Sequence, residues 1–252
     1  AAPLQAAVDD EQGLLAINYT SGSTGQPKGV MYSHRGAYLQ SLAMSGHFAL
    51  RPEHSYLWTL PMFHCNGWCF TWAVTAGGST HVCVPRIDPP LTWRIICEQG
   101  ITHLSAAPTA LLMIAEAAEA APSLRPSRPV KASTGGAPPS PALLARLAEL
   151  GFHVTHLYGL TETYGPCVIN QWQPEWSSLT ASEQSALNAR QGIGNVVTST
   201  VEVVDDQGRP VPADGTSPGE IVISGNNVML GYYKDEAATE AALRDDRGGY
   251  RV

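Results

Sequence analysis

Short runs of β-branched and aromatic residues alternate with longer amphipathic segments over the first two thirds of the chain. The short runs, which we interpret as strands, are residues 14–19, 55–60, 80–84, 103–106, 130–133 and 154–157. The longer segments place apolar residues three and four positions apart, as amphipathic helices do, over residues 35–50, 69–76, 91–99, 110–121 and 142–150. Strands that alternate with helices are typical of a parallel sheet covered by helices. The pattern therefore predicts an α/β fold, with mostly parallel sheets flanked by helices.

The pattern changes after residue 192, where helical segments give way to alternating strands. Residues 200–204 alternate in polarity and run into a turn at Gly208, and a second strand is expected over residues 220–224. Residues 234–244 have the composition of a closing helix. The sequence thus predicts two parts, an α/β core over residues 1–192 and a smaller β-rich, distorted barrel-like subdomain over residues 193–252.

Composition narrows the class of protein. The 252 residues are 44% hydrophobic and 15% charged, which allows a buried core in one or two domains. A net charge of −7 without a basic run argues against nucleic acid as a partner, and no apolar stretch reaches the roughly 18–20 residues of a membrane span. The five cysteines are too sparse for a disulfide scaffold, which predicts a reducing compartment. We expect the cytoplasm, with the peroxisome as the alternative in a eukaryote.

The chain starts without Met and ends without a helix cap, so we expect an internal fragment. Its oligomeric state is open.

A loop rich in glycine and hydroxyl residues follows the first strand. Residues 20–29 hold three glycines, four hydroxyl residues and Lys28. Glycines let backbone N–H groups face an anion, hydroxyls donate to phosphate oxygens, and lysine adds a mobile positive charge. Pro27 precedes Lys28, so this is not the common Gly-Lys-Ser/Thr nucleotide loop. The loop predicts polyphosphate binding; a plain Gly/Ser turn is the alternative.

Residues 19–30, Tyr-Thr-Ser-Gly-Ser-Thr-Gly-Gln-Pro-Lys-Gly-Val, resemble the signature of the adenylate-forming (AMP-binding) superfamily of acyl-CoA synthetases, amino-acid-activating domains and luciferases. The resemblance implies a fold that is the central part of the large N-terminal domain of these enzymes. It also implies ATP contacts from Thr20, Ser21, Gly22, Ser23, Thr24, Gly25 and Lys28, with Lys28 catalytic.

Two further segments resemble the same family. Tyr-Gly-Leu-Thr-Glu-Thr at residues 158–163 comes after the last predicted strand of the core and resembles its second signature. The resemblance places Tyr158 against the adenine and includes Gly159 among the nucleotide contacts. It implies that Thr161 and Glu162 are catalytic, with Thr161 at the α-phosphate and Glu162 on Mg²⁺, a cation that prefers carboxylate oxygen. Alone, this hexapeptide is explained equally well by a strand exit and a helix cap. Residues 133–138 resemble the adenine-side glycine turn, which implies contacts from Gly135, Gly136 and Ala137.

The segment at residues 61–68, Pro-Met-Phe-His-Cys-Asn-Gly-Trp, indicates the branch of the family. Amino-acid-activating domains usually present an aspartate here, and none occurs between Pro61 and Arg86. The segment resembles acyl-CoA synthetases, which implies that His64 is catalytic, beside the acyl pocket and the path of the thiol. A buried core histidine is the alternative for His64. Residues 173–176 and 189–193 resemble short- and medium-chain fatty acid–CoA ligases.

The family resemblance implies a two-step reaction in the full-length protein. A carboxylate attacks the α-phosphate of ATP with Mg²⁺ present, giving acyl-AMP and pyrophosphate, and the thiol of coenzyme A then takes the acyl group. Residues 1–192 would bind ATP and the acid, and residues 193–252 would lead toward a hinge and a C-terminal domain. We expect the fragment alone to be inactive. The alternatives are a non-catalytic nucleotide-binding module and an enzyme that delivers acyl groups to a carrier protein.

Overall fold

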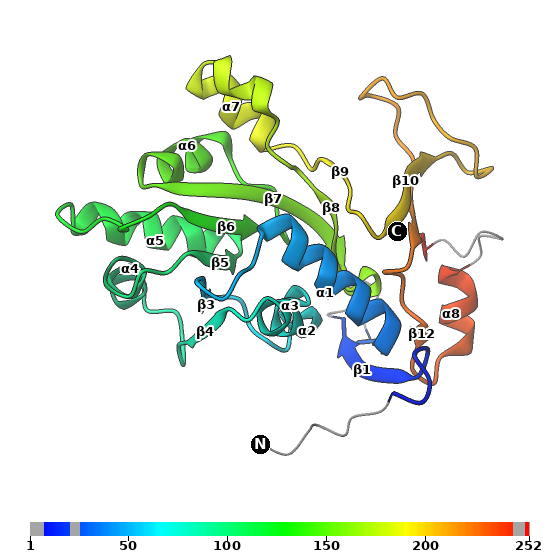
Figure 1. The fold of residues 1–252 in the computed structure, drawn as a ribbon. Helices are drawn as coiled ribbons and strands as arrows, with labels where there is room; N and C mark the ends of the chain where they lie inside the picture. Colours follow the sequence, from blue (N-terminus) through cyan, green and yellow to red (C-terminus); the bar gives the residue numbers. More distant parts are fainter. Residues whose placement is uncertain (1–7, 21–25, 244–249, 252) are drawn as a thin grey trace.

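The computed structural model describes residues 8–20, 26–243 and 250–251 (Figure 1). Its central feature is a seven-stranded sheet in the order β4-β3-β5-β6-β7-β8-β9. Neighbouring strands from β4 to β7 are parallel, whereas β8 and β9 continue the sheet in antiparallel pairs. The strands are β3 Ser55–Trp58, β4 Thr80–Cys83, β5 His103–Ala106, β6 Val130–Thr134, β7 Phe152–Leu160, β8 Gly165–Ile169 and β9 Ile193–Gly194. The predicted α/β fold with a mostly parallel sheet is confirmed.

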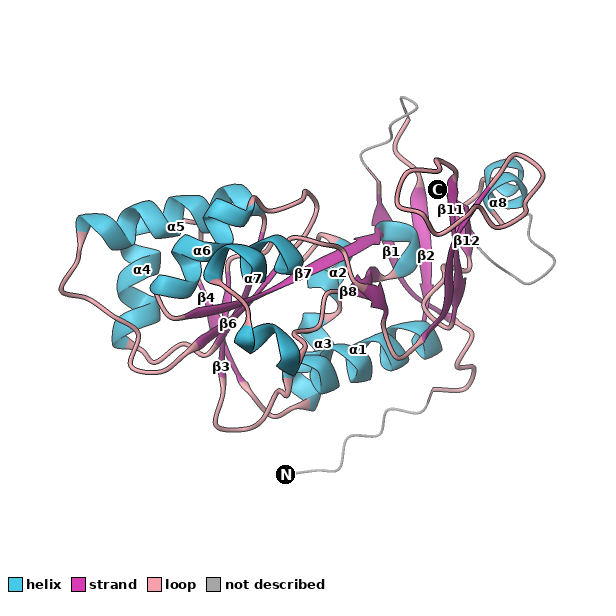
Figure 2. Ribbon diagram, turned by 90° about the horizontal axis from the view of Figure 1, so that it is seen from above, coloured by secondary structure: helices cyan, strands magenta, loops and turns pink. Residues whose placement is uncertain are grey.

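Helices cover both faces of this sheet. Viewed from above, α4, α5 and α6 lie on one side of the strands and α1 and α3 on the other (Figure 2). Successive strand residues point to opposite faces, so Leu57 of β3 packs with Trp93 and Leu111, whereas Tyr56 packs with Met44 and Phe70. The helices are α1 His34–Phe48, α2 Cys65–Trp68, α3 Phe70–Ala76, α4 Pro89–Glu98, α5 Pro108–Ala120, α6 Pro141–Glu149, α7 Ala181–Asn188 and α8 Glu236–Ala242, with 3₁₀ turns η1 Thr161–Thr163 and η2 Pro174–Ser178.

Local signals explain where several helices begin and end. The side chains of Ser33 and Ser140 accept hydrogen bonds from the first turns of α1 and α6, as N-caps do. Gly100 and Gly151 follow α4 and α6 with φ angles of 62° and 89°, the left-handed conformation in which helices commonly terminate. In the described part of the chain, no helix has the length and apolarity needed to cross a membrane.

The first predicted strand exists, but its expected place in the parallel sheet is wrong. β1 (Leu14–Tyr19) pairs antiparallel with β2 (Gly29–Ser33), a strand that the sequence analysis missed, and β2 pairs on its other edge with β12 (Gly231–Tyr232). These strands form a separate three-stranded sheet. Periodicity defines a strand and its faces but not its partner.

The C-terminal strands form a third sheet. β10 (Thr198–Val204) pairs antiparallel with β11 (Glu220–Gly225), as predicted, and the backbone of β13 (Tyr250–Arg251) pairs with the other edge of β11. Helix α8 starts at Glu236 rather than at the predicted residue 234 because the side chain of Asp235 caps it, accepting from the N–H of Ala238; the helix ends at Ala242, and residue 244 of the predicted span lies outside the described residues. Strands β8 and β9 and helix α7 were not predicted.

Candidate active site

The second signature begins inside strand β7 rather than after it, which corrects the predicted strand end at residue 157. β8 extends β7 by pairing Leu157 with Ile169 and Leu160 with Gly165. A Cβ atom on Gly159 would lie 1.9 Å from the carbonyl oxygen of Gly165, so only glycine permits this close approach of the two strands. The sheet thereby carries the signature beyond the carboxyl end of β6, the edge where open α/β sheets bind ligands.

Turn η1 is held by hydrogen bonds at its own ends and from β2. The hydroxyl of Thr163 accepts from the N–H of Leu160 at 2.9 Å, and the N–H of Tyr164 donates to the carbonyl of Thr161 at 3.2 Å. Tyr32 of β2 donates its hydroxyl to the same carbonyl at 2.7 Å, and its ring stacks on Tyr164 with centroids 3.9 Å apart. Burial raises the pKa of Tyr32, so this hydroxyl stays a donor. The small sheet therefore fixes the position of the signature turn.

Glu162 presents a carboxylate that is only 8% exposed. Its Oε1 atom accepts a hydrogen bond from the hydroxyl of Tyr232 at 2.8 Å, and its backbone carbonyl accepts from the N–H of Met229 at 2.9 Å. None of the salt bridges among the described residues involves Glu162. A buried carboxylate with one hydrogen bond and no ion pair among the described residues gains stability from a cation, so this group is suited to bind one.

Only the ends of the predicted phosphate loop lie within the described structure. Ser21, Gly22, Ser23, Thr24 and Gly25 fall outside the described residues. The N–H of Thr20 donates to the carbonyl of Lys28 at 3.0 Å, and the N–H of Lys28 donates to the hydroxyl of Thr20 at 3.3 Å, which closes the base of the loop. The Nζ atom of Lys28 lies 4.9 Å from the centroid of the Tyr232 ring. Through Tyr232, the lysine of the loop is brought close to Glu162.

The predicted adenine-side turn follows β6 and lies beside β7. β6 and β7 are parallel with Thr134 opposite His156, so Gly135 comes next to the residue that precedes Tyr158. A Cβ atom on Gly135 would lie 2.8 Å from the carbonyl oxygen of Leu157. Gly136 and Ala137 are exposed, and Gly136 has a φ angle of 80°. The turn therefore presents its backbone outward, near Tyr158.

An unusual backbone turn precedes α3. Cys65, Asn66, Gly67, Trp68 and Cys69 have positive φ angles of 46°, 45°, 62°, 54° and 62°. The predicted helix over residues 69–76 therefore starts one residue later, since right-handed helical geometry begins at Phe70. Left-handed geometry costs roughly 1–2 kcal/mol for each residue other than glycine. Strain of this kind is concentrated at functional sites, where the surrounding structure maintains it.

This left-handed turn places His64 near the signature. The thiol of Cys65 donates to the hydroxyl of Thr161 at 3.6 Å, and His64 is the preceding residue. His64 is exposed rather than buried in the core, and partial desolvation still lowers its pKa, so it is neutral near pH 7. A neutral imidazole at this edge can accept a proton or contact a ligand.

Sequence reasoning did not single out Tyr32 and Tyr232 as site residues, although both contact the signature turn. Tyr32 lies in a strand that was not recognised. Tyr232 lies in a Gly-Tyr-Tyr run, and nothing in that run shows which residue its hydroxyl reaches. Contacts between distant segments of this kind depend on strand pairing.

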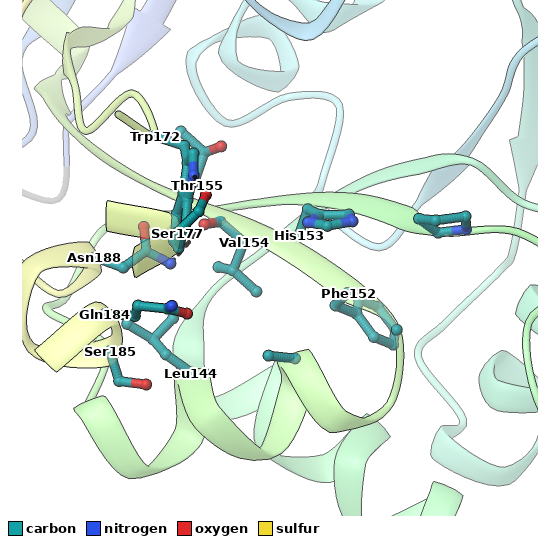
Figure 3. Close-up of a pocket in the computed structure, with 13 residues that line it drawn as sticks. Leu144, Phe152, His153, Val154, Thr155, Trp172, Ser177, Gln184, Ser185 and Asn188 are labelled. Atoms are coloured by element: carbon teal, nitrogen blue, oxygen red, sulfur yellow. Dashed lines mark hydrogen bonds between the residues drawn. The ribbon is translucent and has the colours of Figure 1, made fainter. Parts of the chain in front are cut away.

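A cavity of about 470 Å³ lies away from these residues, at the start of β7 between α6 and α7 (Figure 3). Its lining combines Leu144, Phe152 and Val154 with the polar side chains of Gln184 and Asn188. Among the predicted site residues that the structure describes, none lines it. The amide of Asn188 already donates to the carbonyl of Val154, so it stabilises the contact between α7 and β7. The predicted site residues that the structure describes lie toward the other end of β7, which is therefore the candidate active site.

Comparison with known proteins gives the same family that the sequence motifs resemble. The family model described as AMP-binding enzyme matches residues 2–233. An acetate–CoA ligase of Humulus lupulus is 45% identical over 238 residues, which are 94% of this chain and 42% of that protein. A 4-hydroxybutyrate–CoA ligase of Metallosphaera sedula is 44% identical over 243 residues, 96% of this chain and 44% of that protein. The chain thus spans about two fifths of the length of the curated relatives it matches.

Solved structures agree with the sequence relatives. The inhibitor-bound N-terminal domain of FACL13 from Mycobacterium tuberculosis matches with a TM-score of 0.80 at 27% identity, over 98% of this chain and 58% of that one. O-succinylbenzoate coenzyme A synthetase from Bacillus subtilis, in complex with ATP and magnesium ion, matches with a TM-score of 0.79 at 26% identity, over 96% of this chain and 47% of that one. The fold is shared with these solved structures, and the family match defines the class of protein. The chain belongs to the AMP-binding enzyme family.

Proposed function

We propose that the full-length protein containing this chain activates a carboxylic acid with ATP and transfers the acyl group to coenzyme A. The observation that carries the proposal is the buried carboxylate of Glu162, held by Tyr232 beside the phosphate-loop residue Lys28. The names of the relatives, which include acetate–CoA and 4-hydroxybutyrate–CoA ligases, support a short acid as substrate. Coenzyme A is the proposed acceptor because both are CoA ligases.

The residues at this site fit magnesium bound together with ATP. Mg²⁺ is usually held by one or two carboxylates, with phosphate oxygens and water completing its octahedral shell. Glu162 would supply the carboxylate, which agrees with the chemistry of a hard cation. When bound, the ion would offset the negative charge on the phosphates while pyrophosphate separates from the α-phosphate. The complex of the Bacillus subtilis neighbour with ATP and magnesium ion supports this assignment.

The remaining catalytic roles are positional and electrostatic. A substrate carboxylate oxygen forms a bond to the α-phosphorus of ATP, and the bond from that phosphorus to the bridging oxygen breaks, so pyrophosphate leaves. In our assignment Lys28 neutralises the leaving phosphates and the hydroxyl of Thr161 donates to the α-phosphate. Charges arranged before the reaction stabilise such a transition state without a protein nucleophile. The thiol of coenzyme A then releases its proton and its sulfur bonds to the acyl carbon, while the bond from that carbon to the phosphate oxygen breaks and AMP leaves.

The other predicted contacts complete this assignment. We place the adenine between Tyr158, Gly159 and the turn formed by Gly135, Gly136 and Ala137, and the acyl group near His64. ATP and acid contacts thus come mainly from residues 1–192, with Tyr232 supporting Glu162 from residues 193–252. We propose a cytoplasmic location, with the peroxisome as the alternative, since an Arabidopsis thaliana relative is named a peroxisomal acetate/butyrate–CoA ligase.

The test uses the full-length protein and measures pyrophosphate release from ATP with acids of two to twelve carbons, with and without coenzyme A. We expect release that depends on a short acid, together with acyl-CoA detected by mass spectrometry. Release that no acid stimulates would refute acid activation and favour a nucleotide-binding module. Acyl-AMP formed without acyl-CoA would refute the assignment of the acceptor and favour a carrier protein.

Substitutions test the two charged residues. Lys28→Ala should raise the KM for ATP, because the phosphates lose a positive charge. Glu162→Gln should raise the magnesium concentration needed for half-maximal rate, because the amide binds a hard cation poorly. Lys234→Ala is the matched control, since Lys234 is exposed and its Nζ atom lies over the ring of Tyr233, not Tyr232. Wild-type kinetics in both test variants would contradict these roles.

A further inference from the structure

Tyr232 is held firmly by the backbone and by its surroundings. It lies in β12, where it pairs with Val30 of β2, and its side chain is only 5% exposed. Its N–H donates to the hydroxyl of Thr239 in α8 at 2.8 Å, and that hydroxyl in turn donates to the carbonyl of Asp235. The backbone of Tyr232 is therefore anchored by a strand on one side and a helix on the other, and burial leaves its ring little freedom to move.

This one side chain contacts both charged residues of the proposed site. Its hydroxyl donates to Oε1 of Glu162 at 2.8 Å, and its ring lies below the Nζ atom of Lys28 at 4.9 Å from the centroid. The N–H of Met229, three residues earlier, donates to the carbonyl of Glu162. The segment that carries Tyr232 therefore contacts both the backbone and the side chain of Glu162. The loop lysine and the signature carboxylate, far apart in sequence, therefore share one partner.

The hydroxyl contact should affect how Glu162 binds a metal. A hydrogen bond to one carboxylate oxygen fixes the rotation of the group and leaves the other oxygen free to bind a cation. Partners that orient metal-binding residues in this way typically change metal affinity by about 10–100-fold when they are removed. A neutral phenol suits this purpose, because it donates without adding a positive charge that would compete with the metal.

The ring contact should affect Lys28 in a different way. An ammonium group over an aromatic face is attracted by the negative face of the ring. Before nucleotide binds, this contact holds the lysine beside the ring of Tyr232. The ring thus keeps the charge close to where phosphate oxygens are expected, independent of magnesium.

We propose that Tyr232 is a positioning residue for the nucleotide site, whose hydroxyl orients Glu162 toward the metal and whose ring places Lys28 beside the phosphates. This inference rests on the proposed function, since it requires that the site binds ATP with a divalent cation. The hydroxyl and the ring contribute separately, and substitutions that remove one or both distinguish them.

The experiment measures the Kd of ATP by equilibrium dialysis with the full-length protein and no acid, once at saturating Mg²⁺ and once with a chelator. Tyr232→Phe removes the hydroxyl and keeps the ring, so the Kd should rise about 10-fold with Mg²⁺ and stay unchanged with the chelator. Tyr232→Leu removes both groups, so the Kd should rise under both conditions. Tyr233→Phe is the control, because Tyr233 is 41% exposed and carries Lys234 over its ring; it should match wild type.

The outcomes separate this inference from the proposed function. If Tyr232→Phe changes nothing while Glu162→Gln weakens ATP binding with Mg²⁺, the role of the hydroxyl is refuted. An equal loss in Tyr232→Phe with and without Mg²⁺ would indicate a general structural role and would also refute it. A further loss when Tyr232→Phe is added to Glu162→Gln would contradict action through Glu162. Wild-type protein that does not bind ATP would overturn the proposed function itself.

Discussion

Replacing Gly135 with alanine tests whether backbone contact fixes the adenine-side turn. A Cβ atom at Gly135 would lie 2.8 Å from the carbonyl oxygen of Leu157 and 3.3 Å from the ring of Trp68, whereas ordinary contacts begin at 3.4 Å. The carbonyl belongs to the backbone of β7 and cannot rotate away, so the turn must shift by about 0.6 Å in a close-packed environment. Overpacking of this kind costs about 1–3 kcal/mol.

If at least half of this free-energy cost destabilises the nucleotide-bound state relative to the free protein, the Kd of ATP should rise. The expected rise lies between a few-fold and about 100-fold, since 1.4 kcal/mol corresponds to a factor of ten in Kd. The assay is calorimetric titration of ATP into the full-length protein, with a thermal melt to confirm folding. Gly46→Ala is the matched control, because Gly46 lies in α1 and its added Cβ would meet no atom within 4 Å. A folded Gly135→Ala variant with wild-type ATP affinity would refute the placement of this turn at the nucleotide.

Two further predictions concern buried titratable groups. Burial lowers the pKa of His103 to about 4, below its unfolded value, so the folded state stays neutral while the unfolded state binds a proton. The contribution of His103 to the unfolding free energy should therefore have its full value above pH 6.5 and fall by about 1.4 kcal/mol per pH unit between pH 6.5 and 4. His103→Gln should reduce the pH dependence of the unfolding free energy, and an unchanged slope would contradict the assignment. Burial also raises the pKa of Cys65 to about 11, whereas Cys83 is exposed. Brief iodoacetamide treatment at pH 8 should label Cys83 first by peptide mapping, and equal labelling of Cys65 would show that it is not buried in solution.

Local chemistry in the sequence was enough to locate most elements of the core. The alternation of strands and helices predicted the α/β class, because burial on one face imposes a period on each element. Ser140 and Gly151, at the two ends of α6, show how capping residues set helix limits. The motifs around Lys28 and Glu162 indicated nucleotide chemistry, because an anion and a hard cation each need particular donor atoms.

Pairing between distant segments was decided only by the tertiary structure. The sequence placed residues 14–19 in the parallel sheet, whereas β1 pairs with β2 and β2 with β12, since a strand can use its hydrogen-bonding edge with any partner that packing brings near. The contact of Tyr232 with Glu162 follows from that pairing, and so does the link to Lys28. The sequence determined which residue types are available for phosphate and metal; the fold determined which of them lie close together, because only packing sets distances between residues far apart in the chain.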